Sequence, residues 1–421
     1  MATDRFTVRK ETKARRSGMT CRVFSLKLDL SHISQENQKH LEGLFREAKW
    51  FYNYCLEQDD INDADTTATN VPVKVADKYE DRELNVLRSH MKQGIKTRLF
   101  NSLSSLKALK TNGRKVGRLK FKSEVNSILL KEYDRTYGLD FDNNRIRIQG
   151  LKSWLRVRGM EQIPNDAEIA NATLVRKNGD YYLHVTTYMT PAPSIVPEAS
   201  IGIDFGCHSQ LTFSNGIKVE FQIPPSKRLR RLDRKIMRGN RPASKNKDKD
   251  YAKRRKEYEK LTNKKTDIRH KIVSAITNCF KYVCFQDESI HAWHAGGHGK
   301  KIQHSGIGGI INDLKHKSYT PLEVDRFYAS TQTCPKCGKK NKLSLSERTY
   351  RCECGFVLDR DVKSAVCIEA EGLKQIPTDC RKFTLGESST STFLGLLAHV
   401  GNVKVSKLDS LSQEAAGLAL R

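Results

Sequence analysis

Apolar and polar residues alternate over residues 21–30 (CRVFSLKLDL), which predicts a half-buried β-strand near the start of the chain. From about residue 34 to residue 109 the apolar positions instead recur three and four residues apart, which predicts amphipathic helices. The first helix carries the apolar face Leu41, Leu44, Phe45, Ala48, Phe51, Tyr52 and Cys55. Turn residues over 66–75 are expected to separate it from a second helical run over 84–109.

Short strands are predicted after a basic loop at residues 113–121. Strand patterns cover 128–131, 139–141, 146–149, 154–157, 172–176 and 181–188, with turn signals between them. Together with the strand at 21–30, which precedes the helical insert, they predict a small β-barrel. Prolines at positions 191, 193 and 197 mark a linker.

The second half begins with a predicted hairpin over residues 200–218, turning at Asn215-Gly216. Two basic helices are expected over 226–271, interrupted at 239–242, and a short apolar strand follows at 282–286. The Gly- and His-rich residues 291–309 predict a mobile loop. Residues 378–421 have few apolar positions and clusters of Ser and Thr, so this tail is expected to be poorly ordered.

Net charge narrows the class of partner. Lys and Arg exceed Asp and Glu by 75 to 48, giving +27 and a pI near 9.6, which favours a polyanion such as nucleic acid. About half of this excess lies in residues 226–271, whose basic side chains include the candidate nucleic-acid contacts Arg228, Arg231, Arg234, Lys235, Arg254 and Arg255. Two weaker explanations of this positive charge are a solvent-exposed helix face without a partner and an anionic membrane surface. The sequence contains no run of about 18 apolar residues, so no membrane-spanning helix is predicted. Residues 1–30 lack the apolar core of a signal peptide.

The eleven cysteines indicate a metal site in a reducing compartment instead of a disulfide framework. Cys334 and Cys337 form a CxxC pair, Cys352 and Cys354 form a CxC pair, and glycine follows each pair. Four thiolates are the usual ligands of a structural zinc ion, so we predict a zinc ribbon. The CxC spacing is one residue short, which shortens the second knuckle. The remaining seven cysteines (Cys21, Cys55, Cys207, Cys279, Cys284, Cys367 and Cys380) are scattered and fit small buried residues.

Three acids lie at the ends of predicted strands or helices. Asp204 stands inside an apolar strand, Glu288 follows another, and Asp361 begins a helix directly after the ribbon. Each alone is most simply a helix cap or a surface ion pair. Together they are suited to hold two catalytic Mg²⁺ ions about 4 Å apart. His291, His294 and His298 are the competing metal ligands, but a Gly-rich loop is a poor cage for an ion.

The chain resembles the TnpB family of transposon-encoded RNA-guided endonucleases, which is similar to the compact type V CRISPR effectors. The likeness rests on Ile-Gly-Ile-Asp204-Phe-Gly, the CxxCG and CxCG knuckles, and Asp359-Arg-Asp361-Val-Lys-Ser-Ala. Residues 47–54 (EAKWFYNY) also look like an early helix of the family. The resemblance is most specific from residue 196 onward.

The resemblance implies an α/β multidomain protein with an RNase H-like RuvC nuclease domain and an inserted zinc ribbon. It assigns the catalytic, Mg²⁺-binding acids to Asp204, Glu288 and Asp361, and one structural Zn²⁺ to the four paired cysteines. Asp359 competes with Asp361, which is favoured because the family acid directly precedes a turn that here reads Val-Lys-Ser-Ala. The usual Asn of that turn is Lys363 in this chain.

The implied domains follow in order. Residues 1–33 and 113–195 form a wedge β-barrel, 34–112 a helical recognition lobe, 196–330 and 357–377 the two parts of the RuvC domain, 331–356 the zinc ribbon, and 378–421 the tail.

The implied function is Mg²⁺-dependent cutting of DNA chosen by a guide RNA and a short flanking motif. The implied partners are the guide RNA and target DNA, double- and single-stranded, with no membrane, in the cytoplasm of a prokaryotic cell. Two other readings stay open: an RNA-guided DNA-binding repressor that does not cut, and an unguided zinc-ribbon accessory of transposition. Sequence does not fix the flanking motif or the oligomeric state.

Overall fold

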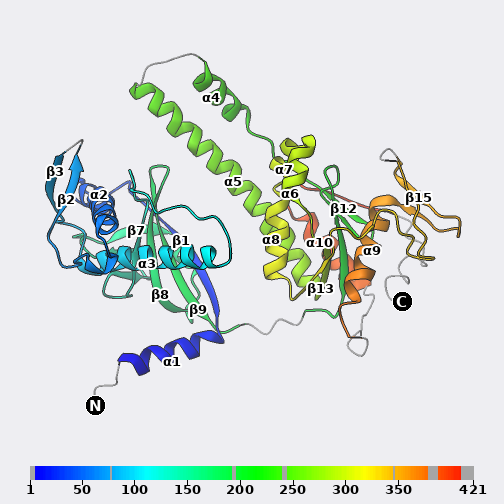
Figure 1. The fold of residues 1–421 in the computed structure, drawn as a ribbon, viewed down its shortest axis with the longest axis horizontal. Coiled ribbons are helices and arrows are strands. Elements are labelled where there is room, and N and C mark those ends of the chain that lie inside the picture. The colour runs from blue at the N-terminus through cyan, green and yellow to red at the C-terminus, as the bar shows by residue number, and fades with distance from the viewer. Residues whose placement is uncertain are drawn as a thin grey trace. The chain divides into compact units, whose positions relative to one another are not determined.

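A computed structural model describes residues 5–75, 78–191, 196–238, 244–344, 347–377 and 387–408 (Figure 1). The chain divides into two compact units, Met1–Pro193 and Ser194–Arg421, and each is described by itself. Within the described residues, no helix is long and apolar enough to cross a lipid bilayer.

The first unit is built on a seven-stranded antiparallel sheet in the order β4-β8-β9-β1-β7-β6-β5. Its strands are β1 (Thr20–Leu28), β4 (Ser127–Leu130), β5 (Tyr137–Asp140), β6 (Arg145–Ile148), β7 (Leu155–Arg158), β8 (Glu168–Lys177) and β9 (Asp180–Met189). The predicted barrel is therefore seen as a sheet with β4 and β5 at its two edges. Strand β1 lies between β9 and β7, so the N-terminal strand completes a sheet whose other members all follow the helical insert.

Helices α2 (Gln35–Glu57) and α3 (Ser89–Thr111) form that insert, and their apolar faces share one core with the sheet. The predicted face of α2 is buried along its length, from Leu41 to Cys55. Two elements were not expected. Helix α1 (Arg5–Ser17) precedes β1, and the predicted turn segment 66–75 contains β2 (Asn70–Val75), which forms a hairpin with β3 (Lys78–Glu83).

The second unit contains a six-stranded sheet in the order β14-β13-β10-β11-β12-β17. Strands β10 (Ser200–Phe205), β13 (Tyr282–Gln286) and β14 (Thr320–Val324) are parallel, whereas β11 (Leu211–Phe213), β12 (Ile217–Glu220) and β17 (Lys404–Lys407) continue the sheet antiparallel. The segment expected to form one hairpin over 200–218 contains three antiparallel strands, and the predicted turn at Asn215-Gly216 joins β11 to β12.

Helices cover both faces of this sheet. Ile201 and Ile203 of β10 share a core with α5 (Lys245–Cys279), α8 (Ile307–Lys317) and α10 (Glu387–Ala398). On the other face, Cys284 and Leu322 pack with α9 (Arg360–Leu373). Because side chains alternate along a strand, Gly202 and Asp204 face α9. A Cβ on Gly202 would lie 2.1 Å from the carbonyl oxygen of Ala365, so only glycine allows α9 to approach this closely.

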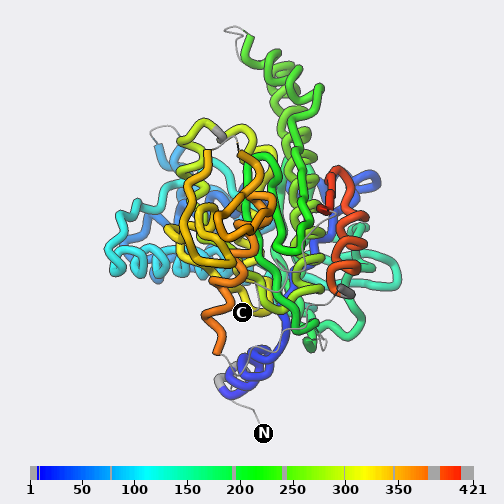
Figure 2. Tube along the Cα trace, turned by 90° about the vertical axis from the view of Figure 1, so that its right-hand side faces the viewer, coloured from blue at the N-terminus to red at the C-terminus, as the bar shows by residue number. Residues whose placement is uncertain are grey.

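The basic segment folds as the predicted pair of helices, α4 (Lys227–Met237) and α5, with residues 239–243 outside the described part. Both views show α4 lying alongside the outer half of α5 (Figures 1 and 2). The segment over 291–309 was expected to be a loop and is helical instead. It forms α6 (Ile290–Trp293), a π-helical turn (His294–His298) and α7 (Gly299–Ser305) before α8 begins.

The expectation of a poorly ordered tail is wrong for residues 387–408. Helix α10 packs on α5, and β17 pairs with β12 at the sheet edge. Phe393 and Leu397 are both fully buried, and the Phe393 ring contacts Phe213 and Phe280 edge to face. These two apolar residues, four positions apart, anchor the helix. The low overall proportion of apolar residues in the tail hid this signal in the sequence. Residues 378–386 and 409–421, including Cys380, lie outside the described residues.

Replacing Phe393 by Ala is expected to lower the free energy of unfolding of the second unit by about 3–5 kcal/mol, because it empties a packed aromatic site. Urea unfolding followed by far-UV circular dichroism measures this change. Leu396→Ala is the control, since Leu396 is 39% exposed on the same helix. Equal, small effects of both substitutions would show that α10 is not docked.

Candidate metal and catalytic centre

The four paired cysteines converge on one point. Their Sγ atoms all lie within 4.8 Å of one another. A metal ion needs three or more Cys, His, Asp or Glu side chains this close together, and the described residues contain this one such group. Cys334 and Cys354 are 3.7 Å apart at Sγ, and Cys337 and Cys352 are 3.6 Å apart. Tetrahedral zinc with bonds of about 2.3 Å separates its sulfurs by roughly 3.8 Å, so the donor set and its spacing fit zinc.

Each knuckle closes on a glycine whose N–H donates to the carbonyl oxygen of the first cysteine, four residues back in the first knuckle and three in the second. Gly338 and Gly355, which follow the two pairs, have φ of 72° and 83°, a conformation that glycine adopts without strain. Strands β15 (Thr349–Arg351) and β16 (Val357–Asp359) connect the second knuckle to α9. The N–H of Cys354 helps to lower the pKa of Cys352 to about 6, which favours the thiolate that a metal binds. The short CxC pair therefore still presents both sulfurs to the site.

The three predicted acids come from three adjacent elements. Asp204 lies on the α9 face of β10, and Glu288 lies two residues beyond the end of β13. Since β10 and β13 are parallel neighbours, their carboxyl ends meet at one edge of the sheet. Asp361 stands in the first turn of α9, which packs across β10 and β13. The structure thus brings the three side chains to one region.

Electrostatics show how strongly the acids interact. Burial, followed by the charges of Asp361 and Glu288, raises the pKa of Asp204 well above its ordinary value. Burial also raises the pKa of Glu288, while the charge of Arg326 opposes that rise. Carboxylates of like charge that interact in this way favour a bound cation. Three oxygen-donor side chains at a half-buried edge are the ligands that Mg²⁺ prefers.

Asp359, the competitor of Asp361, is occupied by other contacts. Its carboxylate caps α9 by accepting the N–H groups of Asp361 and Val362 at 3.0 and 3.1 Å. Both of its oxygens also lie 2.8 Å from Nζ of Lys218. Asp361 is the acid whose charge reaches Asp204, and it contacts Arg360 (3.4 Å) and Arg348 (3.9 Å). The geometry therefore favours the choice of Asp361.

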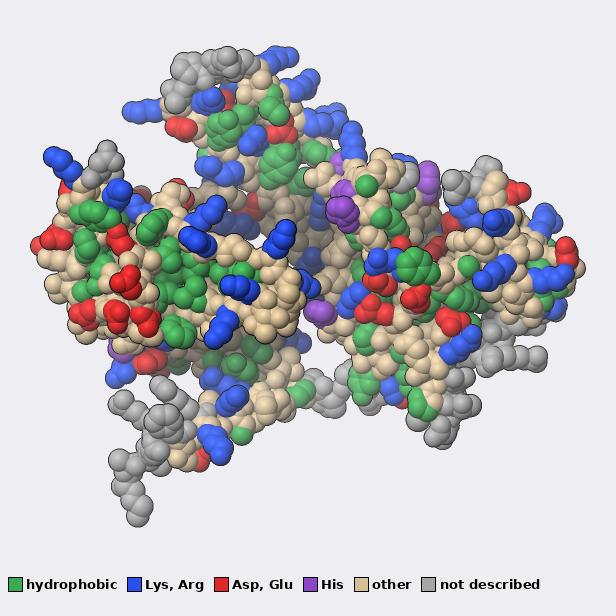
Figure 3. Space-filling model, viewed as in Figure 1, with side chains coloured by type: hydrophobic (Ala, Val, Ile, Leu, Met, Phe, Trp, Pro, Cys, Tyr) green, Lys and Arg blue, Asp and Glu red, His purple; other side chains and the backbone are tan. Residues whose placement is uncertain are grey.

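The six candidate nucleic-acid contacts separate into two groups. Lys235, Arg254 and Arg228 pair with Asp250, Asp233 and Glu257 at 2.7, 3.7 and 3.7 Å, and these ion pairs join α4 to α5. For Arg231, Arg234 and Arg255 the described part of the chain shows no ion pair. Figure 3 shows Lys and Arg side chains over this helical hairpin. The first group stabilises the hairpin, and the second group remains available to a phosphate.

The histidines do not form a metal site within the described residues. His291 and His294 lie on α6 and the π-helical turn, and the side chain of His298 is outside the described part. Within the described residues, His291 and His294 have no further histidine, carboxylate or thiol close enough to complete a metal site.

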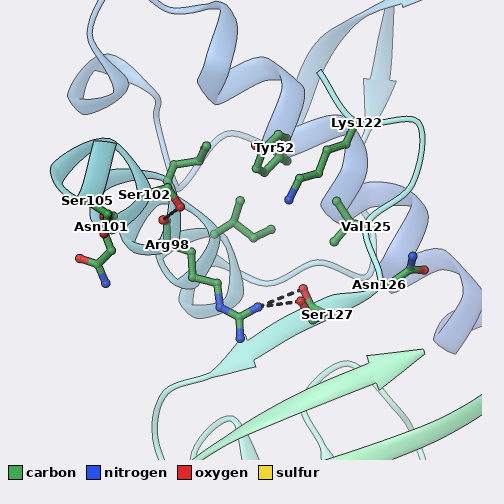
Figure 4. A pocket seen from close by; sticks show the side chains of 11 residues that line it. Tyr52, Arg98, Asn101, Ser102, Ser105, Lys122, Val125, Asn126 and Ser127 are labelled. Atoms are coloured by element: carbon green, nitrogen blue, oxygen red, sulfur yellow. Dashed lines mark hydrogen bonds between the residues drawn. The ribbon is translucent and has the colours of Figure 1, made fainter. Parts of the chain in front are cut away.

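The first unit contains a pocket of about 470 Å³ between α2, α3 and the segment before β4 (Figure 4). Its lining combines an aromatic side chain, two cations and several amides and hydroxyls: Tyr52, Arg98, Asn101, Ser102, Ser105, Lys122, Asn126 and Ser127. Lys122 lies 4.2 Å above the Tyr52 ring, and Arg98 donates to the Ser127 hydroxyl at 3.0 Å. Sequence reasoning missed this pocket because its residues come from three separate segments.

Sequence reasoning also missed an arginine face on β6 and β7. Buried and exposed positions alternate along both strands, which places Arg145, Arg147, Arg156 and Arg158 on the face away from the core. Arg145 and Arg156 are cross-strand partners and line a pocket of about 330 Å³ with the 43%-exposed Trp154. The alternation in RIRIQGLKSWLRVR was the signal that could have revealed it.

Comparison with known proteins supports the resemblance to the TnpB family. A family model described as "Cas12f1-like, TNB domain" matches residues 312–368, which include the ribbon and Asp361. A Streptomyces pristinaespiralis protein named "Putative RNA-guided DNA endonuclease" is 26% identical over 264 residues, covering 60% of this chain and 65% of that protein. The mimivirus proteins "TnpB-like protein L79" and "TnpB-like protein L770" are each 28% identical over 131 residues, covering 28% of this chain and 25% of theirs.

The fold and site define an α/β protein with four cysteines placed to hold one metal ion and with three acids at the end of two parallel strands and the start of α9. The resemblance to the TnpB family that the motifs indicated is confirmed by these matches. The chain spans less than two thirds of the length of the relatives it matches.

Cys337→Ser is expected to abolish stoichiometric zinc binding and to lower the melting temperature of the second unit by several degrees, because structural zinc contributes folding energy directly. Metal analysis of the purified protein and differential scanning calorimetry measure the two effects. Cys21→Ser is the control, since Cys21 is exposed and lies outside the cluster. Unchanged zinc content and melting temperature would contradict a structural zinc site.

Proposed function

We propose that the chain is an RNA-guided, Mg²⁺-dependent DNA endonuclease of the RuvC type. The observation that carries the proposal is that Asp204, Glu288 and Asp361 come from two parallel strands and one helix to one edge of the sheet. Burial and then the charges of Asp361 and Glu288 raise the pKa of Asp204 there. The name of the Streptomyces relative supports the same activity. The sheet order with α9 across one face supports the RNase H-like architecture.

Two Mg²⁺ ions bound here would supply an activated water and stabilise the leaving oxygen. The chain's own contribution is to place three carboxylates at one edge of the six-stranded sheet, on β10, just beyond β13 and in the first turn of α9. Arg326 and Arg360 lie close enough to act on the charges of Glu288 and Asp204, and they offer positive charge to a phosphate at the same edge. Lys218 holds Asp359 as a cap, which keeps the N-terminus of α9 and therefore Asp361 in place.

The domain assignment follows from the same proposal. The seven-stranded sheet is assigned to the wedge, α2 and α3 with their hairpin to the recognition lobe, and the six-stranded sheet to the RuvC domain. The ribbon lies in the chain between β14 and α9, both of which belong to that domain.

The guide RNA is assigned to the arginine face. Arginine pairs bind phosphate, an exposed tryptophan stacks on unpaired bases, and both are common in the recognition of single-stranded RNA. Arg145, Arg156 and Trp154 line one pocket together with the hydroxyl of Ser153. Arg231, Arg234 and Arg255 on the helical hairpin are assigned to the backbone of the nucleic acid.

The flanking motif is assigned to the pocket of Figure 4. Its amides and hydroxyls offer hydrogen-bond donors and acceptors of the kind that read base edges, and its two cations suit the adjacent phosphates.

The deciding experiment purifies the protein from cells that carry its own locus and sequences the bound RNA. The RNA–protein complex is then incubated in Mg²⁺ with a plasmid library in which the sequence flanking the guide-matched target is randomised. Cutting at guide-matched sites beside one motif is expected. A specific RNA without cutting would favour the repressor, and the absence of a specific RNA would favour the unguided accessory.

Asp204→Ala is expected to slow cutting by more than about 100-fold, because even the outer partners of metal ligands are worth 10- to 100-fold. Guided DNA binding should stay within about twofold, since no phosphate contact is removed. Gel shift and cleavage time courses measure both quantities. Asp267→Ala is the control, because this acid is exposed and pairs with Lys271 on α5. Retained cutting by Asp204→Ala would refute the proposed site.

Exchanging Arg145 and Arg156 together for Glu is expected to weaken guide-RNA binding and to flatten its salt dependence by about 1.4 in log–log slope, at about 0.7 per phosphate contact. Fluorescence anisotropy over a salt series measures both. Arg82→Glu with Arg135→Glu gives the same change in net charge at side chains that do not line this pocket. Equal losses in both double variants would indicate a general charge effect instead of a site.

A further inference from the structure

Phe327 is the most exposed large apolar side chain of the described residues, at 88%. It lies three residues beyond β14, in the segment that leads to the ribbon. Single exposed apolar residues are common on protein surfaces, so exposure alone assigns no role. The way the chain fixes the backbone around Phe327 distinguishes it.

One anchor of this backbone is Gln286, the last residue of β13. Its buried side-chain amide donates to the carbonyl oxygens of Asp325, Arg326 and Tyr328 at 2.9, 3.1 and 2.8 Å. The N–H of Phe327 also donates to the Asp325 carboxylate at 2.7 Å. The peptide groups on both sides of Phe327 are therefore held, while its ring is left in solvent.

A second anchor is Lys363 on α9. This lysine is fully buried, and its Nζ donates to the carbonyl oxygens of Ser330 and Thr333 at 2.8 and 3.1 Å. The same Nζ lies 4.2 Å from the centre of the Tyr350 ring in the ribbon. The segment 325–333 is thus tied at one end to the strand that precedes Glu288 and at the other to the helix that carries Asp361.

A third contact places the segment beside the acids. Arg326 forms an ion pair with Asp287, the neighbour of Glu288, and donates from Nε to the Asp287 carbonyl oxygen at 3.2 Å. The exposed ring of Phe327 follows directly in the chain. An exposed aromatic ring on a backbone that is fixed next to Asp287 and Glu288 suits an unpaired base, because every base has a face that stacks on an aromatic side chain.

We propose that Phe327 is a stacking site for one unpaired base of the single-stranded DNA that reaches the acid cluster, and that this contact holds the adjacent phosphate at the acids. The proposal rests on the proposed nuclease function and adds a substrate-binding residue to it. Stacking depends on the ring and not on base identity, so the site tolerates any sequence.

The test compares wild type, Phe327→Ala, Phe327→Trp and Tyr319→Ala, each as the full RNA–protein complex. Tyr319 is 65% exposed at the opposite end of β14, so it controls for loss of an exposed aromatic ring. Phe327→Ala is expected to bind single-stranded DNA roughly tenfold more weakly in Ca²⁺ and to raise KM for its cleavage in Mg²⁺ by a similar factor. Phe327→Trp and Tyr319→Ala should match wild type.

Abasic substrates give a readout that a folding defect would not produce. An abasic site moved along the strand should weaken wild-type binding most at one position. At that position the losses from the abasic site and from Phe327→Ala should not add, because both remove the same contact. Additive losses, or equal binding by wild type and Phe327→Ala, would overturn the proposal.

The binding measurements need no cutting, so they separate the two hypotheses. If wild type binds single-stranded DNA through Phe327 but cuts nothing, the nuclease proposal fails and the stacking site stands. If wild type cuts and Phe327→Ala cuts and binds equally well, the stacking site fails and the nuclease proposal stands.

Discussion

The close approach of α9 to β10 is the contact on which the candidate centre depends. Gly202 leaves no room for a side chain against the Ala365 carbonyl oxygen, and Glu369 of the same helix accepts a hydrogen bond from the Ser200 hydroxyl at 2.5 Å. Two turns of helix are therefore seated directly on the strand that carries Asp204. Any side chain at position 202 would push the helix outward and separate Asp361 from Asp204, with no change to either acid.

The same helix joins the acids to the ribbon. Val362 packs in the core of the ribbon, Lys363 donates to the segment before Cys334, and Asp359 closes both β16 and the cap of α9. Burial lowers the pKa of Lys363 to about 8. Where the family has Asn, this chain buries a cation between two carbonyl oxygens and an aromatic ring. The departure from the motif is thus compensated by specific partners.

Much of this site could be predicted from sequence because its signals are local. Each signal lies in one continuous stretch of sequence. These signals are the apolar strands around Asp204 and before Glu288, the cysteine pairs and the basic helices. The Arg145–Trp154–Arg156 face and the pocket around Tyr52 and Arg98 could not be read in this way, since they form only when distant strands and helices meet. Helix α10 was missed because two buried residues, Phe393 and Leu397, outweigh a polar average.

Strand β17 has a consequence for the order of folding during synthesis. It covers β12, which would otherwise present unpaired backbone groups at the sheet edge. Residues 404–407 leave the ribosome more than 180 residues after β12, and Asp361 follows Asp204 by more than 150 residues. Because chains fold as they emerge, the six-stranded sheet has an open edge and an incomplete acid cluster for most of its synthesis. The acid cluster and then the sheet edge are therefore completed late, after the first unit has emerged in full.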